Sequence, residues 1–168
     1  DGFGASFPKL RYLNIAGNGF TGKESDFLGL TSITYLNISG NYFQGSVVGL
    51  FEGPLEVLDL SRNQFQGHIS QVNSISSFSL SRLVYVDLSE NQLSGEFFNY
   101  LNEAQNLRHL NLAHNRFSKE QLLHIGMLSG LEYLNLSASN LIGEMPGEIS
   151  MLSNLKTLDL SRNHLSGH

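Results

Sequence analysis

The chain has 168 residues, a formal net charge of −5 and 40% hydrophobic residues, a composition typical of one soluble domain that gives no sign of a nucleic-acid binder or a basic membrane-surface binder. Cysteine and tryptophan are both absent, which excludes disulfide frameworks and thiolate metal sites. There is no apolar run of about 18 residues, and residues 1–7 do not look like a secretory signal. We therefore expect no membrane insertion by this segment itself.

A single sequence frame, L-x-x-L-x-L-x-x-N, recurs along the whole chain. Neighbouring copies begin 22 to 28 residues apart, which is the spacing of leucine-rich repeats. The longest interval comes from residues 71–78, which we interpret as a bulge on the convex side; a loop that contacts a partner is the alternative. The seven copies begin at Leu10, Ile33, Leu55, Leu83, Leu107, Leu131 and Leu155.

Each copy predicts the same three elements in chain order. The L-x-L alternation has period 2 and predicts a short, half-buried strand. A segment that carries glycine in most copies, such as Gly22 or Gly143, predicts a turn. Apolar residues at triplet spacing, such as Ile125, Leu128 and Leu131, then predict short 3₁₀ turns on the way back.

One copy cannot bury its own leucines, but stacked copies share a continuous core. We therefore predict an α/β-type solenoid: a right-handed superhelix of about seven repeats with a parallel concave β-sheet and a convex side of 3₁₀ turns and loops. Residues 1–168 are expected to form one solenoid fragment, with both ends inside repeats and the caps missing.

The asparagine that closes the frame is expected to lie inside the solenoid, where its amide can bond backbone groups of neighbouring coils. The sixth copy has Ser139 instead, which predicts a weaker ladder there, repaired by water or by Asn140. The ladder residues are Asn18, Asn41, Asn63, Asn91, Asn115 and Asn163.

Two segments resemble one known family most closely. Residues 158–167, LDLSRNHLSG, and residues 140–146, NLIGEMP, are similar to the plant-type leucine-rich repeat L-x-x-L-x-L-S-x-N-x-L-S-G-x-I-P. The fifth copy departs from this pattern at Ser118–Lys119, where the family's second, convex-side strand is in doubt.

The resemblance implies the extracellular domain of a plant receptor-like kinase, on the outer side of the plasma membrane. A single transmembrane helix and a kinase or pseudokinase domain would lie outside these residues. The partner it implies is a secreted peptide or a co-receptor ectodomain. The alternatives are a secreted or scaffold protein, such as a cell-wall enzyme inhibitor or a receptor-like protein without a kinase.

Equivalent outward strand positions should form columns on the concave face. The third position predicts an aromatic stripe that either contacts a partner or only packs across strands. The eighth position varies in charge, and its members either pair with one another or bind a charged ligand group; His114, and with less support His109, would gain charge at mildly acidic pH. The candidate binding residues are Tyr12, Tyr35, Tyr85, His109, Tyr133, Arg62, Glu90, His114 and Arg162.

The fifth position is Asn or Asp in every copy, which we interpret as architecture. Some peptide receptors of this family hold a peptide carboxylate with paired arginines on one strand, and these uniform columns leave no room for that pair. Asn37-Ile38-Ser39 and Asn135-Leu136-Ser137 are glycosylation sequons, and we expect glycans on Asn37 and Asn135. The strand consensus alone also explains both triplets.

No sequence pattern indicates an enzyme, a cofactor or a metal site. Residues 17–22 match G-x-G-x-x-G, but they lie in a repeat turn and not at a helix start, so nucleotide binding is rejected. The six histidines show no zinc-binding spacing, and no Ser-His-acid set can be assembled. We therefore predict a binding module, whose ligand and oligomeric state the sequence does not identify.

Overall fold

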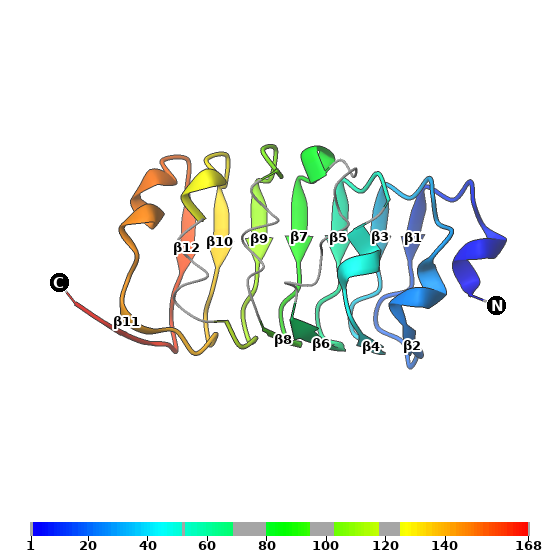
Figure 1. Ribbon diagram of the computed structural model, residues 1–168, viewed down its shortest axis with the longest axis horizontal. Coiled ribbons are helices and arrows are strands. Elements are labelled where there is room, and N and C mark those ends of the chain that lie inside the picture. Colours follow the sequence, from blue (N-terminus) through cyan, green and yellow to red (C-terminus); the bar gives the residue numbers. More distant parts are fainter. Residues whose placement is uncertain (1, 52, 69–79, 95–102, 118–124, 168) are drawn as a thin grey trace.

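The computed structural model describes residues 2–51, 53–68, 80–94, 103–117 and 125–167. Seven short strands stand side by side and form one parallel sheet along the molecule (Figure 1). Each comes from one copy of the frame, so the predicted parallel sheet is confirmed. In spatial order the strands are β1 (Tyr12–Asn14), β3 (Tyr35–Asn37), β5 (Val57–Asp59), β7 (Tyr85–Asp87), β9 (His109–Asn111), β10 (Tyr133–Asn135) and β12 (Thr157–Asp159).

The segments after the frames also form strands, where the glycines predicted turns and the family resemblance implied a second strand. Their pairing is parallel, and glycines such as Gly45 and Gly143 adopt the positive φ values that the local backbone requires. After the fifth frame, the described residues form only a single bridge, between Ser94 and Arg116. Ser118–Lys119 and the expected bulge at 71–78 lie outside the described residues. The two flanking sheets contain β2 (Thr21–Lys23), β4 (Tyr42–Gly45), β6 (Gln64–His68) and β8 (Gln92–Ser94), and β11 (Ile142–Glu144) and β13 (His164–Ser166).

The return path of the coils contains short 3₁₀ helices, as the triplet spacing predicts. Across the ranges that the structure describes, no helix is long and apolar enough to cross a membrane. Within the described residues, the 3₁₀ helices include η1 (Phe3–Ser6), η2 (Glu24–Phe27), η3 (Val48–Phe51), η5 (Leu80–Arg82) and η7 (Gly147–Met151).

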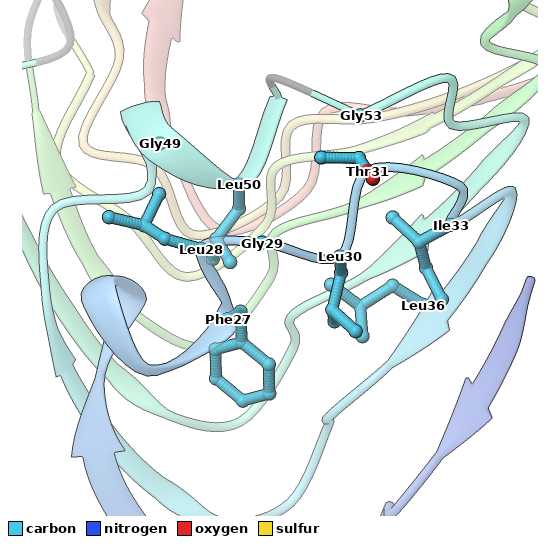
Figure 2. Close-up of a pocket in the computed structure, with 10 residues that line it drawn as sticks. All are labelled: Phe27, Leu28, Gly29, Leu30, Thr31, Ile33, Leu36, Gly49, Leu50 and Gly53. Carbon is cyan, nitrogen blue, oxygen red and sulfur yellow. The ribbon is translucent and has the colours of Figure 1, made fainter. Parts of the chain in front are cut away.

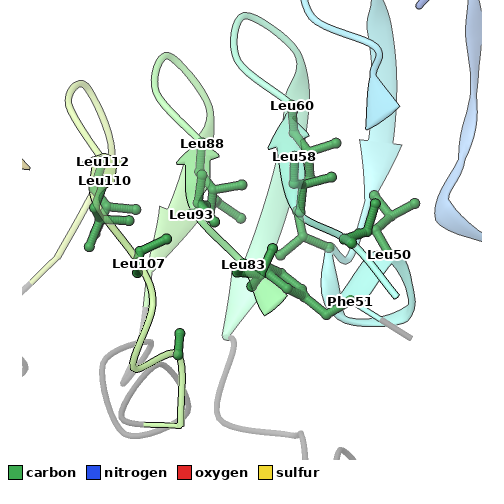
Figure 3. Close-up of a cluster of buried hydrophobic side chains, with 14 of the residues drawn as sticks. Leu50, Phe51, Leu58, Leu60, Leu83, Leu88, Leu93, Leu107, Leu110 and Leu112 are labelled. Carbon is green, nitrogen blue, oxygen red and sulfur yellow. The ribbon is translucent and has the colours of Figure 1, made fainter. Parts of the chain in front are cut away.

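The core is a row of leucines that runs from coil to coil (Figure 3). The middle residue of each strand points inward, and Leu58, Val86 and Leu110 are completely buried. Leu60, Leu88 and Leu112, two residues further on, continue the same row and are also fully buried. The outward residues of the same strands are therefore held on a rigid support.

The frame asparagines bond neighbouring coils. Asn63 is buried; its Nδ2 donates to Ile38 O at 3.0 Å and to Leu60 O at 3.2 Å, and its Oδ1 accepts from Phe43 N at 3.0 Å. Asn41, Asn91 and Asn115 repeat this pattern in their own coils, and Asn163 repeats it half-buried.

Two members of the ladder differ from the expectation. Asn18 is exposed, because it lies in the first coil and only one neighbouring coil covers it; its Nδ2 bonds Ile15 O within that coil. In the sixth copy the Ser139 hydroxyl itself donates to Leu112 O at 3.2 Å, so it replaces one amide bond. Asn140 is exposed with φ 61°, and it does not repair the ladder.

Candidate functional site

The concave face carries an ordered column of rings. The strands pair without stagger, so Tyr12, Tyr35, Val57, Tyr85, His109, Tyr133 and Thr157 lie in line. The Tyr12 and Tyr35 rings stack with centroids 4.2 Å apart. His109 is stacked between Tyr85 and Tyr133, at 4.1 Å from each. Val57 separates these two stacks.

Aligned rings make a preformed contact surface. The side chains from Tyr35 to Tyr133 are half-buried, whereas Tyr12 is 58% exposed. Stacked aromatic side chains lose little conformational freedom when a partner binds, which favours recognition. The alternative that the rings pack across strands also holds, since three of the ring pairs are in contact.

The eighth column shares a backbone conformation that the sequence analysis missed. Gly17 and Gly40, as well as the five other members, have φ between 50° and 68°. Glycine adopts this left-handed conformation without strain, and the two glycines were the available signal. The non-glycine members are Arg62, Glu90, His114, Ala138 and Arg162.

Charges in the eighth column pair with each other. Arg62 Nε lies 3.1 Å from Glu90 Oε1, and the two side chains are 71% and 49% exposed. Such exposed pairs contribute about 0–1 kcal/mol. His114 follows in the next coil and Arg162 in the last, and both are exposed.

The fifth column contains two adjacent acids, Asp59 on β5 and Asp87 on β7. Asp59 Oδ1 accepts from Ser61 N at 3.0 Å and Ser61 Oγ at 2.7 Å. Asp87 bonds Ser89 in the same way, and its Oδ2 accepts from Asn111 Nδ2 at 3.0 Å. Burial raises the pKa of Asp59 above its usual range, and the Asp87 charge raises it further, although the Ser61 bonds oppose this.

Two members of the ring column, Tyr85 and His109, have shifted pKa values beside these carboxylates. Burial raises the pKa of Tyr85 to about 12, and Asp87 and Asp59 contribute further. Burial lowers the pKa of His109, against the opposing effect of both carboxylates. Burial therefore disfavours the charged imidazolium of His109, and its gain of charge at mildly acidic pH stays a prediction. Its Nε2 is buried and has no hydrogen-bond partner among the described residues.

A hollow of about 510 Å³ opens on the concave face beside the acidic pair. Its wall combines the fifth and eighth columns, so carboxylates, hydroxyls and one guanidinium face the same space. The fifth column is uniformly Asn or Asp in the sequence, and the signal within it is that two neighbouring copies both carry Asp. The hollow is lined by Ala16, Gly17, Ser39, Gly40, Asp59, Ser61, Arg62, Asp87, Ser89, Glu90 and Asn111.

A second pocket, of about 240 Å³, lies among the η2 and η3 segments of the first two complete coils (Figure 2). Phe27, Leu30, Ile33 and Leu50 line it, and Thr31 is its one hydroxyl-bearing residue. It offers apolar volume but few groups that could orient a ligand.

Both sequon asparagines lie on the concave sheet. Asn37 Oδ1 accepts from Ser39 N and Ser39 Oγ, and Asn135 Oδ1 accepts from Ser137 N. Both are half-buried, and Asn37 is the register neighbour of Asp59. Within the described ranges no group of three or more His, Asp or Glu side chains could hold a metal ion. His124 and His168 lie outside those ranges.

Comparisons with known proteins agree with this architecture. A family model described as "Leucine Rich Repeat" matches residues 9–30, 32–53, 54–79, 82–103 and 154–168. A second, described as "Leucine Rich repeats (2 copies)", matches residues 105–147. Together the matched segments cover most of the chain.

Several of the similar proteins are plant receptor kinases. A leucine-rich repeat receptor-like protein kinase of Arabidopsis thaliana, whose name questions its kinase activity, is 44% identical over 106 residues, 63% of this chain and 11% of the relative. The ectodomain of the A. thaliana receptor kinase GASSHO1/SCHENGEN3, solved with CASPARIAN STRIP INTEGRITY FACTOR 2, has a TM-score of 0.83 at 32% identity. The Arabidopsis receptor kinase HAESA, solved with the peptide hormone IDA and the co-receptor SERK1, has a TM-score of 0.79 at 37% identity.

This chain is therefore much shorter than the proteins it resembles. It is covered to 97% in both structural comparisons, but it spans only 20% of the GASSHO1/SCHENGEN3 chain and 27% of the HAESA chain. The chain matches a segment of each of these longer receptor ectodomains.

Proposed function

We propose that this chain, which belongs to the leucine-rich repeat family, is a ligand- or co-receptor-binding segment of a plant receptor-like kinase ectodomain. The observation that carries the proposal is the concave sheet with its aligned Tyr85–His109–Tyr133 stack. A rigid sheet presents its outward side chains with little ordering cost on binding. Seven strands span roughly 29 Å, which an extended peptide of about nine residues would cross.

The proposed partner is a secreted peptide or the ectodomain of a co-receptor. The solved HAESA complex contains both kinds of partner, which supports this choice of class. The proposed location is the extracellular side of the plasma membrane, with any kinase, active or inactive, outside these residues. We also propose N-glycans on Asn37 and Asn135, which would crowd the concave face near those strands.

A binding screen tests the proposed function. The protein, with its glycans intact, is immobilised at about pH 5.5 and exposed to secreted plant peptides and co-receptor ectodomains. We expect a partner whose binding falls at least about tenfold in the combined variant Tyr85→Ala, Tyr133→Ala and His114→Ala, because buried aromatic anchors dominate binding energy. Tyr42→Ala, at an exposed tyrosine on β4 of a flanking sheet, is the matched control and should bind as the wild type does.

Two results would contradict the proposal. A partner that binds the combined variant unchanged would place recognition away from the concave face. If no peptide and no ectodomain in the panel binds, the result would favour a structural scaffold.

A further inference from the structure

The aromatic column has one gap between rings, above Val57. Tyr35 on β3 and Tyr85 on β7 stand on either side of it. Two strand spacings separate them, about 9.6 Å, whereas neighbouring rings elsewhere in the column stack at 4.1–4.2 Å. The space between the facing rings is therefore about one planar group thick.

The floor next to this gap is negatively charged. Asp59 follows Val57 by two residues and leaves the same face of β5, and Asp87 is its register neighbour. Among the described residues neither carboxylate forms an ion pair, and the nearby Arg62 is paired with Glu90. Burial makes the largest contribution to the raised pKa of Tyr85, and both carboxylates raise it further. Their charge therefore acts directly on one wall of the gap.

The fold does not require charge at these two positions. Asn37 accepts the same two bonds from Ser39, at 3.0 and 2.7 Å, that Asp59 accepts from Ser61. Asparagine would serve there without the penalty of burying a carboxylate. Asp59 thus adds charge and not architecture, whereas the second oxygen of Asp87 also accepts a bond from Asn111. Both acids add their charge beside an opening between rings.

We propose that the gap above Val57 binds an arginine side chain of an extended peptide partner, with the guanidinium stacked between Tyr35 and Tyr85 and facing Asp59 and Asp87. Arginine fits better than lysine because its cation is planar, stacks on aromatic faces and pairs with carboxylates. The hollow that begins at Asp59 leaves room for the neighbouring peptide residues. This inference rests on the proposed function and names the ligand group its surface recognises.

The test uses a blocked pentapeptide, Gly-Gly-Arg-Gly-Gly, titrated against protein before and after enzymatic removal of N-glycans, with the Val57 methyl and Tyr35 and Tyr85 ring NMR signals as the readout. We expect saturable shifts at these signals. The same peptide with citrulline, which has the shape of arginine without its charge, should bind about tenfold more weakly. Asp59→Asn combined with Asp87→Asn should weaken the binding of the arginine peptide by a similar factor.

Val57→Tyr should abolish binding, because a ring then fills the gap, and this position tolerates tyrosine in neighbouring coils. Thr157→Tyr adds a ring to the same column far from Asp59 and Asp87, and it should leave binding unchanged. Equal binding of the arginine and citrulline peptides, tighter binding of a phenylalanine peptide, or binding that survives Val57→Tyr would overturn the proposal. If a partner from the binding screen is lost in the Tyr85, Tyr133 and His114 variant but unaffected by Val57→Tyr, this inference fails while the proposed function stands.

Discussion

At the fifth position of the concave strands, aspartate and asparagine differ in charge but accept the same backbone hydrogen bond. The fifth position of each frame accepts the backbone N–H two residues ahead, whether the acceptor is Asn37, Asp59 or Asn135. A buried carboxylate carries a desolvation penalty that an amide does not. Charge at Asp59 should therefore reduce stability, and its effect should depend on pH.

Asp59→Asn should stabilise the protein at neutral pH. The folded-state pKa of Asp59 is raised, mainly by burial, so the folded protein binds a proton more readily than the unfolded chain. The wild type therefore recovers stability as pH falls through that raised pKa, and the advantage of the variant should vanish below the ordinary carboxyl value of 3.8. Urea unfolding of both proteins between neutral and acidic pH measures this difference.

Asp159 supplies a control of opposite sign. Its hydrogen bonds from Ser161 lower its pKa, so its charged form is favoured in the folded state. Asp159→Asn should slightly destabilise at neutral pH, and that loss should disappear in acid. If both variants shift stability in the same direction, burial is not what distinguishes the two aspartates.

At the scale of the coil, the asparagine ladder supplies bonds that strands and 3₁₀ turns cannot. Each internal ladder amide bonds its own coil and the preceding one, and these backbone groups are buried. These hydrogen bonds therefore help to hold each coil against the next. Their contribution to the free energy of unfolding depends on how completely neighbouring coils cover them.

Asn63→Ala should destabilise by about 3 kcal/mol, because it leaves buried carbonyls and an N–H without partners. Asn18→Ala should lower the free energy of unfolding by less than about 1 kcal/mol, since Asn18 is exposed to water that can replace its hydrogen bonds. Chemical denaturation of the two variants gives the comparison. Equal losses would mean that the ladder acts within each coil and not between coils.

The main sheet was predictable because its signal lies in the repeated frame, with Leu58 and its equivalents marking the buried side of each strand. The residues alone did not predict the flanking strands, which only the family resemblance implied. Their glycines indicate turns when each coil is considered separately, and only pairing with neighbouring coils makes these segments strands. The Asp59–Asp87 pair was not predicted for a similar reason. Each acid fits the repeat consensus by itself, and the two are recognised as neighbours only when the coils are placed side by side.

At the scale of the whole molecule, the main contacts between the described elements lie within one coil or between neighbouring coils. Stability in such a solenoid is close to a sum of coil and interface contributions. Equivalent residues therefore differ according to their neighbours: the middle strand residue is completely buried at Leu134 but 40% exposed at Leu158. Leucines at equivalent positions thus contribute differently to stability along one chain.

Leu134→Ala should destabilise by about 3 kcal/mol, because it leaves a cavity between two packed coils. Leu158→Ala, at the equivalent position of the next coil, should lose less than about 1 kcal/mol, since much of the side chain is already in contact with water. Hydrogen exchange adds the spatial test: Leu134→Ala should lower protection in β9, β10 and β12 together, and Leu158→Ala in β12 alone. Loss of protection across all seven strands in both variants would show that the solenoid unfolds as a single unit, with interfaces too strongly coupled for any coil to open separately.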